Sequence, residues 1–335
     1  MEATDRRAGG FPPLTDQIRV AAIDIGSNSI RLLVGDVSAP EDGDFSLKTI
    51  TRAGEPCRLA RGLEESGLID PGVARRAATV TADFVARARN LGCRHTVIGA
   101  TAALRGASNG PEVADLIASA AGLPIRVLSG EEEARIVYKA VVCGLGVAVK
   151  RHSCVVFDIG GGSTEVVSGV GAEAGRWVSL PFGAVTLTEK HFRSNPPLPG
   201  EIEALDSEVR SEIMHQCALL PVQSPVLAGV GGTVTVLALM DRGLEQYDPT
   251  FIEGWGIKRD RLEQHATRLL GSNLKERRSW PGMGEGRADI VAAGAIVVRA
   301  LADRFPAPAL LCSTQGLRYG LARLAAEEAF TGRAG

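Results

Sequence analysis

The chain has 335 residues, is 45% hydrophobic and 4% aromatic, and carries a formal net charge of −2. This length suggests two domains, and the composition is that of an α/β protein with a core of aliphatic side chains. The near-zero charge excludes a general attraction to nucleic acid or to an anionic membrane, so any site for a polyanion must be a local basic patch.

The six cysteines show no C-x-x-C pair and no metal-ligand spacing. Cys154 and Cys312 lie in apolar runs and are expected to be small core residues, which favours a reducing, cytoplasmic compartment. Residues 1–17 contain charges and prolines but no apolar core of a signal peptide, and we expect them to be a disordered leader. No apolar run is long enough to predict a transmembrane helix.

The first half of the chain predicts an antiparallel start followed by crossover units. Three strands joined by tight turns are expected at 19–25, 31–37 and 45–51, the last two around Asp42-Gly43-Asp44. A helix is expected from Pro71, with Asp70 as its N-cap, to about Leu91. Strands at 95–100 and 125–128 then alternate with helices at 111–121 and from Ser129 to about Cys143.

The second half restarts the same order, which predicts two domains of similar architecture. Strands are expected at 153–159, 165–169, 175–180, 226–230 and 309–312. Helices are expected after 183 and after 233, and at 201–218, 260–270, 289–302 and 317–329. The stretch 196–200 predicts a rigid loop, and 247–258 predicts irregular structure.

Two related glycine turns carry the strongest signal. The segment from Asp24 to Arg31 (DIGSNSIR) matches the segment from Asp158 to Glu165 (DIGGGSTE), with an apolar run on both sides of each turn. Three consecutive glycines favour a place where backbone amides come close to a ligand, and an acid beside such amides suits a metal-bound phosphate. Two ordinary hairpins are the alternative, although an Asp at the same place in both favours a paired site.

Three further patterns each have a structural alternative. Ser129 with Glu132 fits a capping box, so the glutamates at 131–133 can be explained by the helix start, although Glu133 lies one residue beyond the capping position. The stretch 229–233 predicts an anion site at a helix start or a plain turn. Arg31 and Arg105 could clamp a phosphate or be solvated surface residues.

Other chemistries find little support in the sequence. The five histidines show no ligand spacing and are expected to be surface or core residues. Neither a G-x-S-x-G nucleophile turn nor a G-x-x-x-x-G-K-S/T phosphate loop is present, which weakens acyl transfer and P-loop hydrolysis as hypotheses.

Taken together, these motifs resemble the exopolyphosphatase / guanosine pentaphosphate phosphohydrolase family. The segments that carry the resemblance are 24–31, 101–105, 129–135, 158–165 and 231–233, with 281–282, 287–289 and 316–318. The resemblance runs from about residue 19 to 322 and fits the short, two-domain members. Family members often have Val-His-Gly where this chain has Ile252-Glu253-Gly254.

This resemblance implies two ribonuclease-H-like domains of the actin-like ATPase superfamily facing a central cleft. We expect residues 18–130 with 316–332 to form the N-terminal domain and 131–315 the second. Glu133 is expected to activate the attacking water, and Arg31 to assist catalysis by offsetting phosphoryl charge. Asp158, Glu165 and Asp24 are expected to bind Mg²⁺, with Mn²⁺ as the alternative metal. Phosphate binding is expected from Asn28, Ser29, Arg31, Arg105, Gly161, Gly162, Ser163, Thr164, Gly232 and Thr233.

The leading hypothesis is therefore an exopolyphosphatase that removes terminal phosphate from inorganic polyphosphate. Guanosine pentaphosphate hydrolysis is the enzymatic alternative, and a weakly active sensor that binds guanosine penta- or tetraphosphate is the non-enzymatic one. A sugar kinase or chaperone-type ATPase would share the fold. The resemblance also implies a homodimer, and neither nucleic acid nor membrane is expected as a partner.

Overall fold

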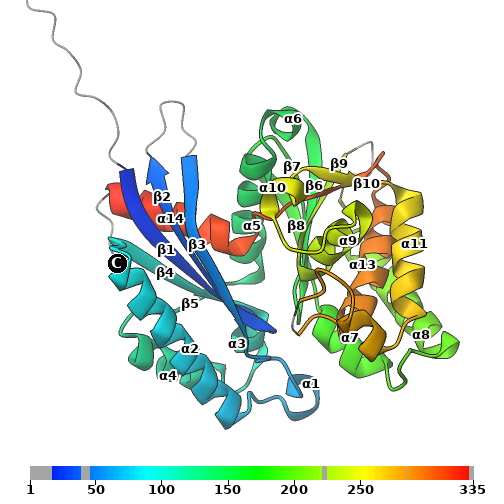
Figure 1. Ribbon diagram of the computed structural model, residues 1–335, viewed down its shortest axis with the longest axis horizontal. Helices are drawn as coiled ribbons and strands as arrows, with labels where there is room; N and C mark the ends of the chain where they lie inside the picture. Colours follow the sequence, from blue (N-terminus) through cyan, green and yellow to red (C-terminus); the bar gives the residue numbers. More distant parts are fainter. Residues whose placement is uncertain (1–16, 39–45, 221–224, 285, 332–335) are drawn as a thin grey trace, which may run out of the picture.

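The computed structural model describes residues 17–38, 46–220, 225–284 and 286–331. Two mixed β-sheets lie side by side, each with its own helices, and Figure 1 shows the two halves of the chain to left and right. The expected leader, apart from Gln17, and the expected turn at 42–44 lie outside the described residues. Gln17 already belongs to the first strand.

The first sheet has the strand order β3-β2-β1-β4-β5. Its strands are β1 (Gln17–Ile25), β2 (Ser29–Ser38), β3 (Ser46–Pro56), β4 (His95–Ala100) and β5 (Arg126–Val127). The first three pair antiparallel, and β1, β4 and β5 pair parallel. The predicted antiparallel start and the crossover units that follow it are confirmed, because hairpin turns can join only antiparallel neighbours whereas parallel strands need a helix between them.

The second sheet has the order β10-β11-β9-β6-β7-β8. Its strands are β6 (Ser153–Ile159), β7 (Thr164–Val170), β8 (Glu173–Leu180), β9 (Val226–Gly231), β10 (Trp255–Ile257) and β11 (Leu310–Cys312). As in the first sheet, three consecutive strands, β6, β7 and β8, pair antiparallel. The strands β6, β9 and β11 then pair parallel. The predicted repeat of strand order is therefore confirmed.

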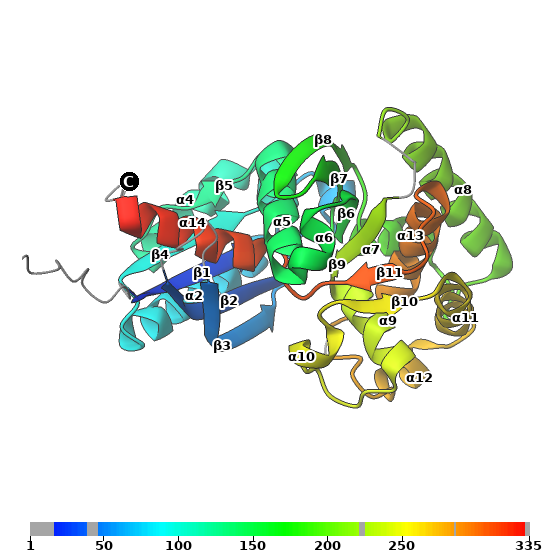
Figure 2. The same cartoon turned by 90° about the horizontal axis from the view of Figure 1, so that it is seen from above.

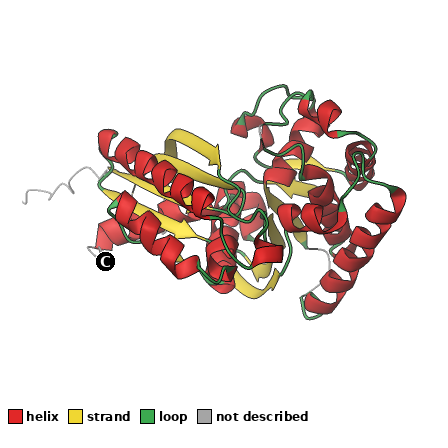
Figure 3. Ribbon diagram, turned by 90° about the horizontal axis from the view of Figure 1, so that it is seen from below, coloured by secondary structure: helices red, strands yellow, loops and turns green. Residues whose placement is uncertain are grey.

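Helices cover both faces of the sheets, as Figure 3 shows. In the first half they are α1 (Leu63–Ser66), α2 (Pro71–Asn90), α3 (Ala102–Gly106), α4 (Gly110–Ala121), α5 (Gly130–Leu145) and α6 (Val147–Lys150). In the second half they are α7 (Ala184–His191), α8 (Pro199–Gln216), α9 (Gly232–Arg242), α10 (Pro249–Ile252), α11 (Arg259–Leu270), α12 (Leu274–Arg278), α13 (Val291–Arg304) and α14 (Leu317–Thr331).

Two of these helices join the halves through a shared core. Along β1, alternate side chains face opposite ways: Ile23 packs with α2 and α4, whereas Val20 packs with α5 and α14. Val156 on β6 belongs to the same core as Val20. Figure 2 shows α5 and α14 next to each other between the sheets. This packing fixes one sheet relative to the other, and so places their strand ends at one cleft.

Several short elements differ from the prediction. The stretch 247–258 was expected to be irregular, yet it contains α10 and β10, and β10 exists because it pairs with β11. Pro199 and Gly200 open α8 instead of closing a loop. The helices α1, α3, α6 and α12 were not predicted, because elements of four or five residues have too little periodicity to appear in sequence.

Candidate active site

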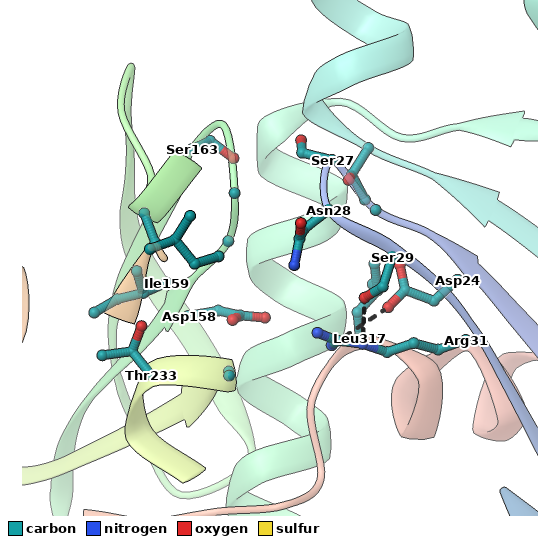
Figure 4. A pocket seen from close by; sticks show the side chains of 18 of the residues that line it. Asp24, Ser27, Asn28, Ser29, Arg31, Asp158, Ile159, Ser163, Thr233 and Leu317 are labelled. Carbon is teal, nitrogen blue, oxygen red and sulfur yellow. Dashed lines mark hydrogen bonds and ion pairs between the residues drawn. The ribbon is translucent and has the colours of Figure 1, made fainter. Parts of the chain in front are cut away.

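Two hairpin turns of the same construction line one cavity in the cleft. Asp24 pairs with Arg31 across the β1–β2 hairpin, and Asp158 pairs with Glu165 across the β6–β7 hairpin. The amide of Gly26 donates to the Ser29 carbonyl at 3.1 Å, and that of Gly160 donates to the Ser163 carbonyl at 3.0 Å. The sequence repeat is thus a structural repeat, and Figure 4 shows the two turns facing each other.

The glycine run is required by the neighbouring hairpin as well as by any ligand. A Cβ added to Gly161 would lie 2.9 Å from the Cβ of Ser27, and one added to Gly162 would lie 3.0 Å from the Ser27 hydroxyl oxygen. Real Cβ atoms do not approach other atoms so closely, so the two backbones can meet only where one of them has no side chain. The glycines let the turns close the cavity from both sides.

The three consecutive glutamates of α5 have three different environments. Glu131 pairs with Arg135 at the surface, and Glu132 completes the capping box with Ser129. Glu133 lines the cavity and is only 7% exposed. Because the first turn of a helix rotates about 100° per residue, one step beyond the cap turns this side chain inward. The capping box and the separate position of Glu133 are therefore both present.

Burial and like charges shape the chemistry of Glu133. Burial raises its pKa well above the usual range, and the nearby Glu165 carboxylate adds to the effect. The guanidinium of Arg105 opposes this shift, with Nη1 donating to Oε2 at 3.0 Å. A carboxylate with a raised pKa in a cavity is a functional-site candidate, since its basicity suits proton transfer near neutral pH.

Three more carboxyl groups lie in the same buried region. Burial raises the pKa of Asp158 to about 7, with a further contribution from Glu165. Glu165 is 1% exposed, accepts a 2.9 Å hydrogen bond from the Ser179 hydroxyl, and has its pKa raised by burial. Burial also raises the pKa of Asp24, against the opposing charge of Arg31 at 3.9 Å. In each of these carboxyl groups, burial outweighs the opposing charge of the nearby arginines.

This carboxylate cluster suits a hard divalent cation. All its donors are oxygen atoms, which Mg²⁺ and Mn²⁺ prefer, and a cation would stabilise the ionised carboxylates, which burial disfavours. Asp24 and Asp158 line the cavity, whereas Glu165 does not. Within the described parts of the chain, no three acidic, histidine or cysteine side chains are grouped closely enough to ligate one ion. An ion here would therefore keep several water ligands, as Mg²⁺ usually does.

The structure brings most of the expected phosphate-binding residues to the same cavity. Those that line it are Asn28, Ser29, Arg31, Gly161, Ser163, Gly232 and Thr233. Gly232 and Thr233 open α9, so free amides at a helix N-terminus point to the site. Gly162 and Arg105 line a neighbouring cavity, which shares Ser27 and Ser163 with this one.

Thr164 is a correction to the expected set. Its side chain is fully buried, and its hydroxyl donates to the Phe182 carbonyl at 2.9 Å. Thr164 directly precedes Glu165 in β7, and successive strand residues face opposite ways, so the two cannot share a face of the sheet. The residue supports the hairpin and does not reach the cavity.

Two arginines that the sequence did not single out complete the site. Arg287 and Arg318 lie with Arg31 along a larger cleft of about 510 Å³, which shares Asp24 and Asp158 with the inner cavity. Burial lowers the pKa of Arg287 to about 10 and also lowers that of Arg318, and in both cases Arg31 adds to the effect. Neither forms an ion pair within the described ranges. Three neighbouring guanidinium groups without enough acid predict an anion between them.

The signal for these two arginines in the sequence is weak. The segments 287–289 and 316–318 contribute to the family resemblance, but neither has a local pattern that indicates phosphate binding. Arg287 follows a glycine-rich loop, and Arg318 is in the first turn of α14. Arg287 and Arg318 come close to each other because the chain crosses from β11 to α14. This crossing belongs to the tertiary structure and has no local sequence pattern.

Glu253 holds this crossing in place. Its carboxylate accepts hydrogen bonds from the Ser313 hydroxyl at 2.8 Å, from the Thr314 amide at 2.7 Å and from the Thr314 hydroxyl at 2.6 Å. The segment that it fixes leads directly to Leu317 and Arg318 in the cleft. Glu253 therefore has a structural task at the position where family members often have histidine.

Two further sequence expectations can be compared with the structure. Cys154 and Cys312 are fully buried core residues, as expected, and none of the six cysteines forms a disulfide. The helices of the described ranges include none with the length and hydropathy needed to cross a bilayer.

Comparison with known proteins agrees with the geometry. Residues 37–326 match the model of the Ppx/GppA phosphatase family. The chain is 33% identical over 290 residues to a Mycobacterium tuberculosis protein named Exopolyphosphatase 2, covering 85% of this chain and 90% of that protein.

Solved structures share the whole fold. The crystal structure of the Aquifex aeolicus member of the Ppx/GppA family has a TM-score of 0.78 at 28% identity, and the match covers 94% of this chain and 99% of that chain. An exopolyphosphatase from Cytophaga hutchinsonii has a TM-score of 0.82 at 22% identity, covering 94% and 98% of the two chains, which shows a common fold. The predicted α/β fold class, with two halves of similar strand order, is confirmed. The chain belongs to the Ppx/GppA phosphatase family.

Proposed function

We propose that this protein is an exopolyphosphatase, which hydrolyses the terminal phosphoanhydride bond of inorganic polyphosphate and releases orthophosphate. The observation that carries the proposal is the placement of the buried Glu133 carboxylate in one cavity with both glycine turns. A base, a phosphate cradle and a positive cleft are the parts that phosphoanhydride hydrolysis requires, because the reaction depends on positioning and charge neutralisation.

The terminal phosphoryl group would lie between the two turns. Backbone amides of Gly161 and Ser163 approach from one side, and the N-terminus of α9 at Gly232 and Thr233 adds a second set of donors. Arg31, whose Nε donates to the Ser29 hydroxyl at 3.1 Å, is held at the edge of the same space. These donors would offset the charge that spreads over the phosphoryl oxygens in the transition state.

Glu133 would activate the attacking water. The oxygen of that water forms a bond to the terminal phosphorus, the bond from this phosphorus to the bridging oxygen breaks, and the water proton passes to the Glu133 carboxylate. The shortened chain leaves with the bridging oxygen as an anion. Arg287 and Arg318 line the adjoining cleft, where they would hold the phosphates of this leaving chain.

We propose Mg²⁺ as the cofactor, with Mn²⁺ as the alternative, held by Asp158 with Asp24 and partly through water. Bound there, the ion would neutralise phosphate charge and so stabilise the transition state. Glu165 would attract the ion without binding it directly. Its buried carboxylate adds negative charge beside Asp158 but does not line the cavity.

Guanosine pentaphosphate is a second candidate substrate. Tyr247 is 41% exposed and lies beside Arg52 in the larger cleft, the one that contains Arg31, Arg287 and Arg318. An exposed aromatic ring next to an arginine can stack on a nucleobase, so this part of the cleft offers a place for guanine. A sensor that binds guanosine tetraphosphate would use the same contacts without turnover.

Initial rates of phosphate release decide among these functions. The purified protein should release orthophosphate from polyphosphate in the presence of Mg²⁺, with little release in a chelator. Parallel assays use guanosine pentaphosphate and ATP at equal concentrations. A higher kcat/KM for guanosine pentaphosphate would reverse the substrate assignment. Tight binding of guanosine tetraphosphate without release from any substrate would favour the sensor.

Three expectations stay proposals. A homodimer and a cytoplasmic location follow from the family and from the free cysteines, and sedimentation and fractionation would test them. The domain ranges 18–130 with 316–332, and 131–315, stay a prediction that limited proteolysis would test.

A further inference from the structure

We infer that Glu253 is a positioning residue for phosphate binding, which keeps Arg318 in the cleft by fixing the segment 313–316. Glu253 itself does not line the cleft, whereas Ser313, Thr314 and Arg318 do. This inference rests on the proposed function, because it takes Arg318 to bind the phosphates of the leaving chain. It adds that a carboxylate outside the anion site increases the affinity of that site for phosphate.

The segment leaves the second sheet where the backbone pairing of β11 ends. The Ser313 amide, one residue beyond the strand, still donates to the Gly229 carbonyl at 2.9 Å. The next two amides are bonded by side chains. The Thr314 amide donates to the Glu253 carboxylate at 2.7 Å, and the Gln315 amide donates to the Ser313 hydroxyl at 3.1 Å. Side chains therefore replace the sheet as partners of the segment, and Glu253 is the first of them.

One carboxylate satisfies three donors of the segment. Besides the Thr314 amide, the hydroxyls of Ser313 and Thr314 donate to Glu253 at 2.8 and 2.6 Å. Ser313 is 1% exposed and Thr314 is 9% exposed, so water has little access to these donors. A buried donor that loses its partner costs more free energy than an ordinary hydrogen bond contributes. Without the carboxylate, the segment would have to move until its donors found new partners.

Glu253 is itself held by the backbone on both sides. Its amide donates to the Pro249 carbonyl at 2.9 Å, at the end of α10. The amide of the following residue, Gly254, donates to the Cys312 carbonyl at 2.9 Å, and Trp255 then pairs with Cys312 between β10 and β11. The carboxylate therefore has a fixed position from which it holds the segment.

Arg318 needs such a restraint because its surroundings disfavour a cation. Burial lowers its pKa, and the like charge of Arg31 adds to this effect. Arg318 lies in the first turn of α14, two residues after Gly316, whose carbonyl accepts the Tyr319 amide at 2.9 Å. A partly buried guanidinium that is repelled by its neighbour lowers its free energy by turning toward water. The fixed segment opposes this movement by fixing the start of α14.

The sign of the effect separates positioning from charge. A carboxylate near an anion site repels the anion, so on Coulombic grounds alone its removal should tighten phosphate binding. The hydrogen bonds predict the opposite result, because the segment is released when the carboxylate is lost and Arg318 leaves the cleft. The KM for polyphosphate should therefore rise when Glu253 loses its charge.

The test uses Glu253→Gln, Arg318→Gln and the variant that combines them. Glu253→Gln keeps the shape of the side chain but replaces an acceptor oxygen by a donor, so it cannot satisfy all three donors. Glu245→Gln is the control for charge, because Glu245 is exposed, lies eight residues earlier in the chain and does not line the cleft. KM and kcat are measured with tripolyphosphate and Mg²⁺, and thermal melting checks that each variant folds.

We expect Glu253→Gln to raise KM by about three- to thirtyfold, with kcat within about twofold of the wild-type value, because the lost binding is common to the ground state and the transition state. Glu245→Gln should leave KM unchanged or lower it slightly. If Glu253→Gln does not fold, Glu253→Asp takes its place. Glu253→Asp keeps the charge but withdraws the carboxylate from the segment, so it should also raise KM.

The combined variants show whether Glu253 acts through Arg318. The KM of Glu253→Gln/Arg318→Gln should equal that of Arg318→Gln alone, because nothing is left to position. Arg287→Gln provides the contrast, since Arg287 lines the same cleft but lies outside the segment. In Glu253→Gln/Arg287→Gln, the two single effects on KM should multiply to within about twofold.

Three outcomes would overturn the role of Glu253. KM stays at the wild-type value or falls in Glu253→Gln, or Arg318→Gln has the wild-type KM, or the effects of Glu253→Gln and Arg318→Gln multiply. A wild-type protein that releases no phosphate would instead mean that the proposed function has failed. The Kd of tripolyphosphate, measured by calorimetry on the same proteins, would then test Glu253 separately, with the same order of affinities expected.

Discussion

A single peptide unit separates the glutamate that caps α5 from the glutamate that faces the cavity. Glu132 accepts the Ser129 amide at 2.8 Å, and its pKa is lowered by that contact. Burial raises the pKa of Glu133 instead. Two adjacent glutamates therefore have pKa values that are shifted in opposite directions. Only Glu133, with its raised pKa, suits the role of a general base.

Substitution of Glu133 tests this distinction. Glu133→Gln keeps the shape but cannot accept a proton, so kcat on polyphosphate should fall about 10²- to 10⁴-fold with little change in KM. Glu131→Gln is the control, since the half-exposed side chain of Glu131 pairs with Arg135 at the surface. Phosphate release under saturating substrate measures both. Equal kcat values for Glu133→Gln and wild type would remove the general base from the mechanism.

Asp158 predicts how stability depends on pH. Its pKa is raised to about 7 from an ordinary value of 3.8, so between these limits the folded state binds more protons than the unfolded state. Stability should therefore decrease as pH rises through this window and level off above it. Mg²⁺ should raise the melting temperature more at pH 8 than at pH 5, because only the ionised carboxylate is a ligand.

Melting curves of Asp158→Asn without divalent metal measure this effect, and the variant should lose part of the slope between pH 5 and 7. Asp36 provides a contrast, since its hydrogen bond from Arg19 lowers its pKa. The stabilisation from Asp36 is complete above its ordinary pKa and is lost only in acid. Asp36→Asn should therefore leave the slope above pH 5 unchanged, and an unchanged slope in Asp158→Asn would refute the assignment.

At the scale of elements, one of the differences between the paired hairpins reverses their charge. Their turns share hydrogen bonding and an initial aspartate, but the residue opposite the aspartate is Arg31 in one and Glu165 in the other. One hairpin therefore presents positive charge, and the other concentrates negative charge around Asp158. The same hairpin construction therefore offers a proposed phosphate site on one side and a proposed metal site on the other.

The contact between the turns can be tested through glycine. Gly161→Ala would place a methyl group 2.9 Å from Ser27 Cβ, so it should destabilise the protein by about 1–3 kcal/mol and lower kcat/KM. Gly106→Ala is the control, because a Cβ there meets nothing within 4 Å. Urea unfolding compares the two. A Gly161→Ala protein as stable as the control would show that the turns move apart easily.

At the scale of the whole molecule, the residues proposed to contact the ligand come from both halves. Arg31 belongs to the first sheet, whereas Arg287 precedes α13 and Arg318 opens α14. Asn28 with Gly286, and Arg58 with Asp289, already bridge the cleft. A polyphosphate between these groups should therefore stabilise both halves together.

Thermal melting of Glu133→Gln with tripolyphosphate tests this coupling, since that variant should bind without rapid turnover. Ligand at 100 times Kd adds about 2.7 kcal/mol to the free energy of unfolding and so raises the melting temperature. Adding Arg287→Gln and Arg318→Gln should abolish most of the rise. Adding Arg135→Gln, a surface change outside the cleft, should preserve it. A full rise without the two cleft arginines would exclude them from the binding site.

The sequence by itself determined the hairpins, the long helices and the pair of glycine turns. Strands at 95–100 and 153–159 and the helix capped by Asp70 have the predicted positions, because local periodicity and capping chemistry specify them. The Asp at each turn and Glu133 were also recognisable, since their spacing within short motifs indicates a site.

Only the tertiary structure decided which of these groups share one cavity. Thr164 lies in the motif yet faces the core, because strand alternation turns it away from Glu165. Arg287 and Arg318 have no local signature, and they reach the cleft because α14 crosses from the second sheet to pack on the first. Long-range packing, which no window of sequence contains, brings the two glycine turns to one cavity.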